Sequence, residues 1–315
     1  MPASGSSIFT DADGYQVSLR DLLDLLVFRP REFHARLTWA DLPTLHLLRA
    51  EEASARVAYA TLPSDLAFVT FPTKQGLPLI YGGVELPFGD MMLHGLGETL
   101  HQRTTGASNW GSISLTPASL MVYGRTIAGH DLAPDPGGRV LRPPPQDRQR
   151  LLRLHAQAGR MAETNPALVG NQEIVRGLEQ DMIWALVTCL ATGTPQKIRP
   201  FNRRQSAIVV RLETVLAEHP HQLLRTHDIA DAIGESARTL QSSCSAVLGM
   251  TPSRYQRLRR LKLIRTELMR IRAAPADGAE IVERYGFTGL PEFVSEYWTA
   301  YGEVPPLPPH ASFKR

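Results

Sequence analysis

The sequence predicts an α+β protein, with a β-rich N-terminal domain that includes packed helices and an all-α C-terminal domain. Between about residues 33 and 115, short apolar runs are separated by Gly, Pro, Asn and Asp, a texture typical of a β-sandwich or barrel. Beyond residue 206, apolar residues recur at helical spacing between helix-capping and helix-ending residues. In a chain of 315 residues we expect one domain over 1–192, a linker over 193–205 and a second domain over 206–306.

Local apolar runs predict the N-terminal elements. The first 16 residues are polar and are expected to be loose, whereas Asp21–Phe28 fits either a short helix or a strand. Strands are expected at Leu45–Leu48, Arg56–Ala60, Ala67–Phe71, Leu79–Tyr81 and Ile113–Leu115. Helices are expected from Thr116-Pro117 to Val122, over Gln146–Glu163, and from Asn165-Pro166 to about Ala191.

The helix that ends near Ala191 has an apolar stripe with two interpretations. The stripe can pack under the β-rich domain, or it can form a dimer seam, because the last helix before a linker is well placed to pair with a second chain. Its members are Ile174, Leu178, Met182, Ile183, Leu186, Val187 and Leu190.

Start and stop signals divide the C-terminal third into two similar units. After a helix over Ser206–Glu218, Thr226 is expected to cap a short helix that Gly234 ends, and Ser236 to cap the next. A short helix, a turn with glycine and a second helix form the helix-turn-helix pattern. The later elements are a helix from Thr251-Pro252 to about Ile271, a helix over Gly278–Tyr285, a turn at Gly286-Phe287-Thr288 and a helix over Leu290–Tyr301 closed by Gly302.

Charge is distributed unevenly along the chain. Residues 1–200 hold 18 Lys and Arg against 19 Asp and Glu, whereas residues 201–315 hold 16 against 12. Eight bases and one acid lie within 254–272. This surplus of positive charge indicates either a polyanion partner for the C-terminal third or a solvated helix face.

Several classes of protein find no support in the sequence. The two cysteines, Cys189 and Cys244, have neither disulfide-framework nor zinc-site spacing. The N-terminus lacks signal-peptide features and no apolar stretch reaches the roughly 18 residues of a membrane span, so a cytoplasmic location is expected. Because no nucleophile elbow, P-loop, zinc-protease or complete dinucleotide-binding motif occurs, we expect neither an enzyme nor a cofactor. A metal site inside a barrel stays open as an alternative, from His34, His46, His94, His101, His130 and His155.

A set of residues in the C-terminal third stands in a distinctive order and spacing. The set is Ser236-Ala-Arg-Thr-Leu240-Gln241, Gly249-Met-Thr-Pro252, Tyr255, Arg260-Leu261, Arg265, Leu268, Tyr285-Gly286-Phe287, Phe293, Tyr297 and Gly302-Glu-Val-Pro305. It resembles the DNA-binding domain of the AraC/XylS family of bacterial transcription regulators, over roughly 206–306. The resemblance implies two helix-turn-helix units joined by a long helix, and a separate sensing or dimerisation domain. The first 200 residues resemble more loosely the cupin-like domains of that family.

The resemblance also implies partners. These are double-stranded promoter DNA and RNA polymerase, with a small-molecule effector and a second copy of the chain as further candidates. A helix of 20 residues is about 30 Å long, and successive major-groove faces of DNA recur about every 34 Å. One chain could therefore present both units to adjacent turns of a duplex.

On the first recognition helix, we expect Arg238, Gln241 and Ser242 to contact bases, because they lie opposite Leu240 and Cys244. Arginine suits guanine O6 and N7, and glutamine suits adenine N6 and N7. Thr239 is a further candidate at the shared edge. The alternatives are a surface salt bridge for Arg238 and a solvated helix surface for Gln241.

Phosphate contacts are expected from helix N-termini and from the bases of the long helix. The candidates are Thr226, Ser236, Ser245, Thr251, Arg254, Arg257, Arg259, Lys262 and Thr288. For the basic side chains the alternative is plain solubility.

The sequence departs from the family pattern at several positions. Ser242 stands where the family often has a base, and Cys244 where it usually has a core phenylalanine. The second recognition helix contains Glu292 and Glu296 but no Lys or Arg. Leu290 and Glu292 are its candidate base contacts, the latter through cytosine N4. Because carboxylates are repelled by phosphates, we expect the first unit to read bases and the second mostly to position the protein.

These observations together predict a sequence-specific DNA-binding transcription regulator. Its N-terminal domain would sense a small molecule or a partner and alter DNA affinity by a population shift. Two alternatives remain, a metal-binding cupin-like enzyme with an accessory helical domain and a basic protein-interaction module. Steep salt dependence with duplex DNA would favour the regulator over the interaction module.

Overall fold

The N-terminal domain contains two antiparallel sheets. The computed structural model describes residues 4–19, 23–27, 32–165, 172–197, 200–271 and 278–307. The larger sheet has the strand order β1-β3-β4-β11-β6-β9-β12-β13, and the smaller one has the order β2-β5-β10-β7-β8. The strands are β1 Ser4–Phe9, β2 Leu23–Val27, β3 Ala35–Asp41, β4 His46–Glu52, β5 Arg56–Thr61, β6 Ala67–Pro72, β7 Leu79–Tyr81, β8 Val84–Leu86, β9 Met91–Leu93, β10 Thr99–Thr104, β11 Ser108–Leu115, β12 Arg139–Arg142 and β13 Thr194–Gln196.

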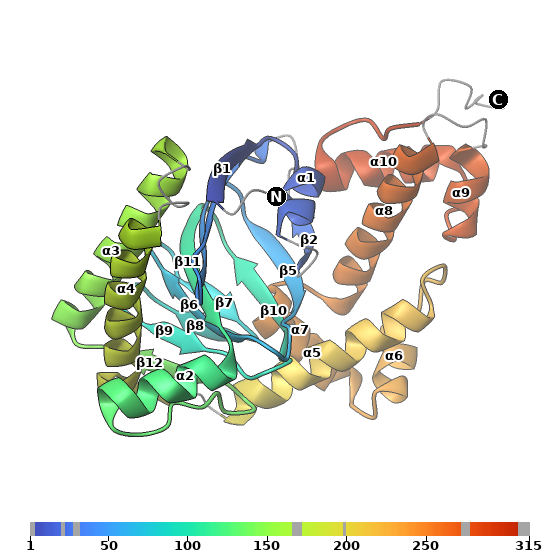
Figure 1. Cartoon of the computed structure of the whole chain (residues 1–315). Coiled ribbons are helices and arrows are strands. Elements are labelled where there is room, and N and C mark those ends of the chain that lie inside the picture. The colour runs from blue at the N-terminus through green and yellow to red at the C-terminus, as the bar shows by residue number, and fades with distance from the viewer. Residues whose placement is uncertain are drawn as a thin grey trace.

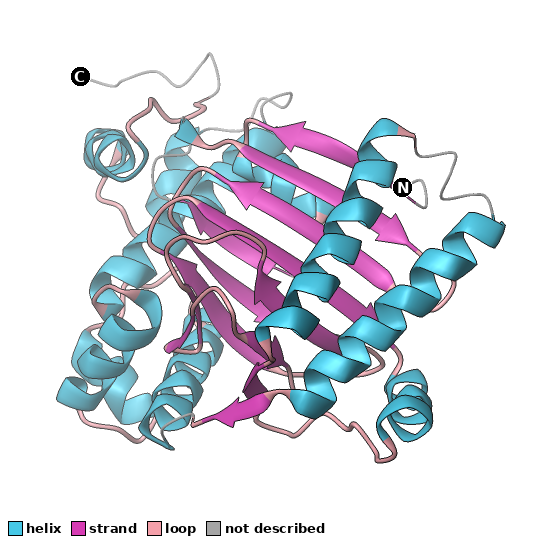
Figure 2. Cartoon of the chain, turned by 90° about the vertical axis from the view of Figure 1, so that its left-hand side faces the viewer, coloured by secondary structure: helices cyan, strands magenta, loops and turns pink. Residues whose placement is uncertain are grey.

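Two long helices cover the outer face of the larger sheet (Figure 2). The helices of this domain are α1 Ala12–Ser18, α2 Pro117–Tyr123, α3 Pro145–Thr164 and α4 Gln172–Thr192, with a π-helical turn, η2, over Gly124–Ala128. Phe71 and Ile113 of the sheet share a buried cluster with Leu151 of α3 and Leu186 of α4. The described members of the α4 stripe lie in this cluster too, so the stripe packs under the β-rich domain and is not free to form a dimer seam.

A second cluster fills the space between the two sheets, and a third lies beyond the smaller sheet. Leu37 and Trp110 of the larger sheet meet Leu79 and Leu100 of the smaller one. On the outer side of the smaller sheet, Leu26 shares a cluster with C-terminal residues. The chain is therefore layered in the order helices, larger sheet, smaller sheet, helices (Figure 1).

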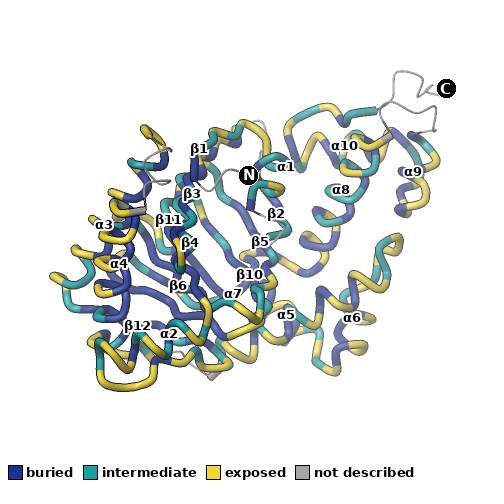
Figure 3. Tube along the Cα trace, viewed as in Figure 1, coloured by how far each residue is buried: buried dark blue, intermediate teal, exposed yellow. Residues whose placement is uncertain are grey.

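The C-terminal domain is entirely helical in its described residues. Its helices are α5 Pro200–Glu218, α6 Thr226–Ala232, α7 Ala237–Leu248, α8 Pro252–Ile271, α9 Gly278–Arg284 and α10 Leu290–Tyr301. One cluster unites α5, α6, α7 and the start of α8, and a separate cluster unites the rest of α8 with α9 and α10. In Figure 3 each helix of these units has a buried side and an exposed side. The α+β prediction, with a β-rich domain before an all-α domain, is confirmed.

The segment expected as a linker over 193–205 is structured where it is described. Thr194–Gln196 forms β13 at the edge of the larger sheet, where Pro195 removes no needed ladder bond. Residues 200–205 already belong to α5, because proline suits the first position of a helix. Asp21–Phe28, for which two conformations were open, is strand over Leu23–Val27.

Candidate nucleic-acid interface

A short turn joins α6 to α7 in the first helix-turn-helix unit. Gly234 in this turn has a φ of 69°, a conformation that suits glycine. Ser236 caps α7, because its Oγ accepts the N–H of Thr239 at 3.0 Å. Leu240 and Cys244 are fully buried and anchor α7 in the core of the unit. The start and the inner face of α7 are thus fixed, which fixes the direction of its outer face.

The outer face of α7 is polar and open to solvent. Arg238, Gln241, Ser242 and Ser245 are exposed, and Thr239 is half-buried. No described carboxylate pairs with Arg238, so the salt-bridge interpretation of this residue finds no support in the described ranges. The Ser242 hydroxyl donates to the Thr239 carbonyl at 3.0 Å, and this bond leaves its oxygen able to accept. Arg238, Gln241 and Ser242 therefore lie together on one accessible face.

Helix α8 exposes only part of its positive charge. Arg254 and Arg257 are exposed, and the Arg257 guanidinium also pairs with Glu296 at 3.2 Å. Arg260 is buried, with its guanidinium 4.7 Å from the centre of the Phe287 ring. Desolvation by burial lowers the pKa of Arg260, which is consistent with a structural position.

Two basic residues assigned to phosphates are instead paired with acidic side chains. The Arg259 guanidinium lies 3.3 Å from Glu213, and the Lys262 ammonium contacts Asp24 of β2. Lys262 also donates to Gln16 of α1 at 2.8 Å. In this conformation the Lys262 charge is neutralised across the contact between the domains, whereas the Arg259 charge is neutralised by Glu213 within the C-terminal domain, so neither is free for the phosphate contact that was predicted. The helical period alone could not show which side of α8 would be covered.

The helix caps predicted at two phosphate sites agree with the structure for Thr251 but not for Thr226. Thr226 is the first residue of α6 rather than its cap, which is Arg225, and its hydroxyl lies 3.1 Å from that of Ser253. Thr251 does cap α8, because its Oγ1 accepts the N–H of Arg254 at 3.3 Å. Both hydroxyls lie close to the exposed beginning of α8.

The second unit offers fewer polar groups than expected. Leu290 is only 7% exposed and packs in the core with Phe293, so its assignment as a base contact is wrong. Glu292 is exposed, but its carboxylate accepts the Thr288 N–H at 2.8 Å and the Thr288 hydroxyl at 2.6 Å. These two bonds lower the pKa of Glu292 and occupy the Thr288 hydroxyl, which was expected at a phosphate. Trp298, in contrast, is 53% exposed and was not singled out from the sequence.

Comparisons with known proteins agree with this architecture. Residues 229–306 match the family described as "Helix-turn-helix domain". The chain is 34% identical over 98 residues to the "Probable thc operon regulatory protein" of Rhodococcus erythropolis. That alignment covers 31% of this chain and spans only 30% of the length of the relative.

Two solved structures resemble the chain over more of its length. The AraC-like transcriptional activator CuxR is 16% identical, with 84% of this chain and 94% of that chain covered and a TM-score of 0.44. ToxT from Vibrio cholerae, bound to an unsaturated fatty acid, is 8% identical, with 84% and 94% covered and a TM-score of 0.30. The family match over residues 229–306 shows that the C-terminal domain is of the AraC helix-turn-helix type. This match confirms, for this domain, the family resemblance seen in the sequence.

The AraC-type domain meets the N-terminal domain through a buried polar cluster that sequence reasoning missed. The Glu213 carboxylate on α5 lies 2.8 Å from Nε2 of His101 on β10. The Tyr255 hydroxyl on α8 donates to the same carboxylate. His101, Glu213 and Tyr255 are each at most 3% exposed. We call these three residues and Arg259 the seam cluster. No local pattern signals it, because His101 lies 112 positions before Glu213, which in turn lies 42 positions before Tyr255.

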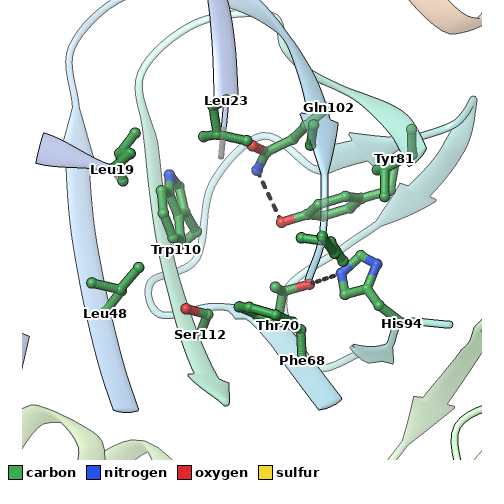
Figure 4. Close-up of a pocket in the computed structure, with 13 residues that line it drawn as sticks. Leu19, Leu23, Leu48, Phe68, Thr70, Tyr81, His94, Gln102, Trp110 and Ser112 are labelled. Carbon is green, nitrogen blue, oxygen red and sulfur yellow. Dashed lines mark hydrogen bonds between the residues drawn. The ribbon is translucent and has the colours of Figure 1, made fainter. Parts of the chain in front are cut away.

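The N-terminal domain encloses a mostly apolar cavity of about 60 Å³ between its sheets (Figure 4). Leu19, Leu48, Phe68 and Leu100 are among its apolar lining residues. Its polar lining groups bond to one another, as Gln102 does to the Tyr81 hydroxyl at 2.9 Å and His94 to the Thr70 hydroxyl at 2.9 Å. Burial raises the pKa of Tyr81 to about 12, so the phenol stays neutral at physiological pH.

Among the described residues, no group of three or more His, Cys, Asp or Glu side chains is arranged to hold a metal ion. His94 and His101 instead take part in hydrogen bonds at different places, in the cavity wall and in the seam cluster. None of the described helices has both the length and the apolar character that are required to span a bilayer.

Proposed function

We propose that the protein is a sequence-specific DNA-binding transcription regulator whose N-terminal domain responds to a small molecule. The observation that carries the DNA-binding part is the exposed polar face of α7, which stands opposite an anchored core. Arg238 can donate two hydrogen bonds to guanine, and Gln241 can both donate to and accept from adenine. Ser242 lies beside them and supplies a further acceptor.

Phosphate binding would surround this face. Exposed Arg254 and Arg257 lie near the beginning of α8, and the capped N-termini of α7 and α8 point backbone N–H groups outward. Ser236, Ser245 and Thr251 complete the proposed set. Contacts of this kind give affinity without sequence preference, whereas the α7 face would give the preference.

The test is selection of bound sequences from a random duplex pool by the purified full chain. We expect an enriched motif and an affinity that falls steeply with salt, by a slope of about 0.9 per neutralised phosphate. Failure to enrich any motif would contradict base recognition. Binding to an acidic protein without DNA competition would instead support the interaction-module alternative.

The proposed effector is a small, uncharged and mainly apolar molecule. The cavity lining offers hardly any polar group that is not already bonded. A neighbouring cavity of about 120 Å³ shares Leu19, Leu48 and Phe68 with the first. Because typical ligand sites are about 300–1,000 Å³, binding would require these three side chains to move and join the two spaces.

A thermal-shift screen with small apolar molecules tests the effector site. A true ligand should raise the melting temperature in a concentration-dependent way. The shift should disappear in an Ala60→Leu variant, because Ala60 lines the cavity and a larger side chain would fill it. A shift that persists unchanged in this variant would place the ligand elsewhere.

Three further parts belong to the proposal. A regulator of promoters works where the DNA is, so we propose a cytoplasmic location. Contact with RNA polymerase and formation of a homodimer follow from the same function. A dimer would use a surface other than the α4 stripe, which the core already occupies. Sedimentation of the full chain with and without its selected duplex tests the dimer.

A further inference from the structure

The smaller sheet separates the cavity from the AraC-type domain by the thickness of one strand. Successive side chains of a strand point to opposite faces. On β10, Leu100 and Gln102 line the cavity, whereas His101 between them enters the seam cluster. Arg103 also faces the AraC-type domain, since a Cβ added at Gly249 would come within 2.8 Å of its Nη1.

The neighbouring strands repeat this division. On β5, Ala60 lines the cavity, and Tyr59 stacks on His101 with ring centres 4.9 Å apart. On β2, Leu23 lines the cavity, and Asp24 pairs with Lys262 of α8. A molecule that pushes these strands from the cavity side would therefore also move the side chains that contact the AraC-type domain on the other side.

Glu213 is the centre of the contact on that side. Its carboxylate is removed from water and is contacted by groups from two other elements, His101 of β10 and Tyr255 and Arg259 of α8. A buried carboxylate is strongly disfavoured unless such partners neutralise it. Tyr255 has its pKa raised by burial and by Glu213, so it remains a donor to that carboxylate. Moving His101 would thus weaken the support of Glu213 and, through it, the placement of α5 and α8.

We propose that β10 couples the cavity to the AraC-type domain and that Glu213 is the positioning residue at the receiving end. This inference rests on the proposed function, because it describes how occupancy of the effector cavity would reach the DNA-binding unit. A molecule that displaces Leu100 or Gln102 shifts His101, and the first helix-turn-helix unit then changes its pose against the sheet. By thermodynamic reciprocity, loosening the seam cluster also changes the stability of the cavity wall.

The first experiment needs neither a ligand nor DNA. Ala60→Val and Ala60→Leu enlarge a side chain in the cavity opposite Leu100, its register partner on β10. Hydrogen exchange of the full chain then compares 206–218 and 252–262, which face the seam, with 290–301, which belongs to the other core. We expect faster exchange by about fivefold or more at the seam, the lower end of usual coupling between sites, and little change over 290–301. The milder Ala60→Val keeps the test valid if Ala60→Leu folds poorly. Unchanged seam exchange in a folded variant overturns the proposal.

The second experiment measures DNA affinity in a double-mutant cycle between Ala60→Val and Glu213→Gln, on the selected duplex. The combined change should differ from the product of the single changes by about fivefold or more. Glu235→Gln is the matched control, because the Glu235 carboxylate likewise pairs with basic side chains, those of Arg204 and Arg211, but only within the AraC-type domain. Its cycle with Ala60→Val should be additive, and coupling equal to that of Glu213 would overturn the role of the seam cluster.

The outcomes separate the two levels of inference. If no duplex is bound but seam exchange responds to Ala60→Val, the coupling stands and the proposed DNA-binding function fails. If a specific duplex is bound but neither exchange nor the cycle responds, the function stands and the coupling fails.

Discussion

The two helix-turn-helix units have the same framework and different surfaces. Both second helices have 12 residues, and both end at a glycine with positive φ, 73° at Gly249 and 67° at Gly302. Nine positions before that glycine stand Leu240 and Phe293, each fully buried. The outer faces differ at matching positions.

Counting back from the closing glycine pairs the surface residues of α7 and α10. Arg238 corresponds to Pro291, Gln241 to Val294 and Ser245 to Trp298. At these three positions hydrogen-bonding groups in the first unit are replaced by apolar ones in the second, whereas Ser242 corresponds to another serine, Ser295. Different residues therefore determine the packing of each unit and the chemistry of its outer face. We predict that the second unit keeps the packing and contributes less to base recognition than the first.

The largest expected effect tests whether the second unit is needed only as a framework. Phe293→Ala should lower the free energy of unfolding by about 3–5 kcal/mol, and Leu240→Ala by about 2–5 kcal/mol, as measured by chemical denaturation. After correction for the folded fraction, Phe293→Ala should weaken the binding of all duplexes to the same extent, and the protein should still select the same motif. Leu240→Ala should lose the motif. A motif that shortens on Phe293→Ala would show that the second unit also reads bases.

The next effect compares the matched surface positions. Arg238→Ala should cost about 1–3 kcal/mol on the selected duplex and relax one base position. Pro291→Ala, at the same offset in α10, should change specific binding by no more than about 0.5 kcal/mol, as for a surface position away from special features. Titrations on selected and random duplexes provide both numbers. Equal losses on the two duplexes for Arg238→Ala would contradict base contact by this residue.

The sequence predicts the framework of the two units better than it predicts their surfaces. Both units were predicted within a few residues, because caps, closing glycines and helical spacing are local signals. The exposure of Arg238 and Gln241 also follows from spacing, since the buried Leu240 fixes the opposite face. The burial of Leu290 could not be predicted in this way, because a residue at the first position of a helix faces the core or the solvent depending on the preceding turn.

Contacts between distant segments limit the prediction elsewhere. Arg259 and Lys262 look like any basic residues on a helix surface, and only the positions of Glu213 on α5 and Asp24 on β2 show that both are paired. Glu213 and His101 have no mutual signal in the sequence, although their carboxylate–imidazole contact is only 2.8 Å. The residues that join the two domains are therefore the ones that sequence reasoning assigns wrongly or overlooks.

A smaller effect tests whether the second unit lies against DNA at all. Trp298→Lys places a positive charge at the position of the exposed indole. Ser245→Lys places one at the matching position of the first unit. If both helices approach the duplex, each variant should neutralise about one more phosphate. The slope of log affinity against log salt concentration should then steepen by about 0.9. Salt titrations with random duplex measure it. A change for Ser245→Lys alone would mean that α10 stays clear of the backbone.

The smallest effect concerns how the two turns are held. In the first unit the uncharged Ser236 hydroxyl caps α7, whereas in the second unit the Glu292 carboxylate holds Thr288 of the preceding turn, and these bonds lower the pKa of Glu292. A lowered pKa in the folded state means that this contribution to stability is complete above the ordinary glutamate pKa and is lost as pH falls through the lowered value. Hydrogen exchange over 286–292 should therefore accelerate below about pH 4.5, relative to 234–240. Glu292→Gln should remove that difference in pH response. If the wild type and Glu292→Gln respond alike to acid, the carboxylate is not what holds the second turn.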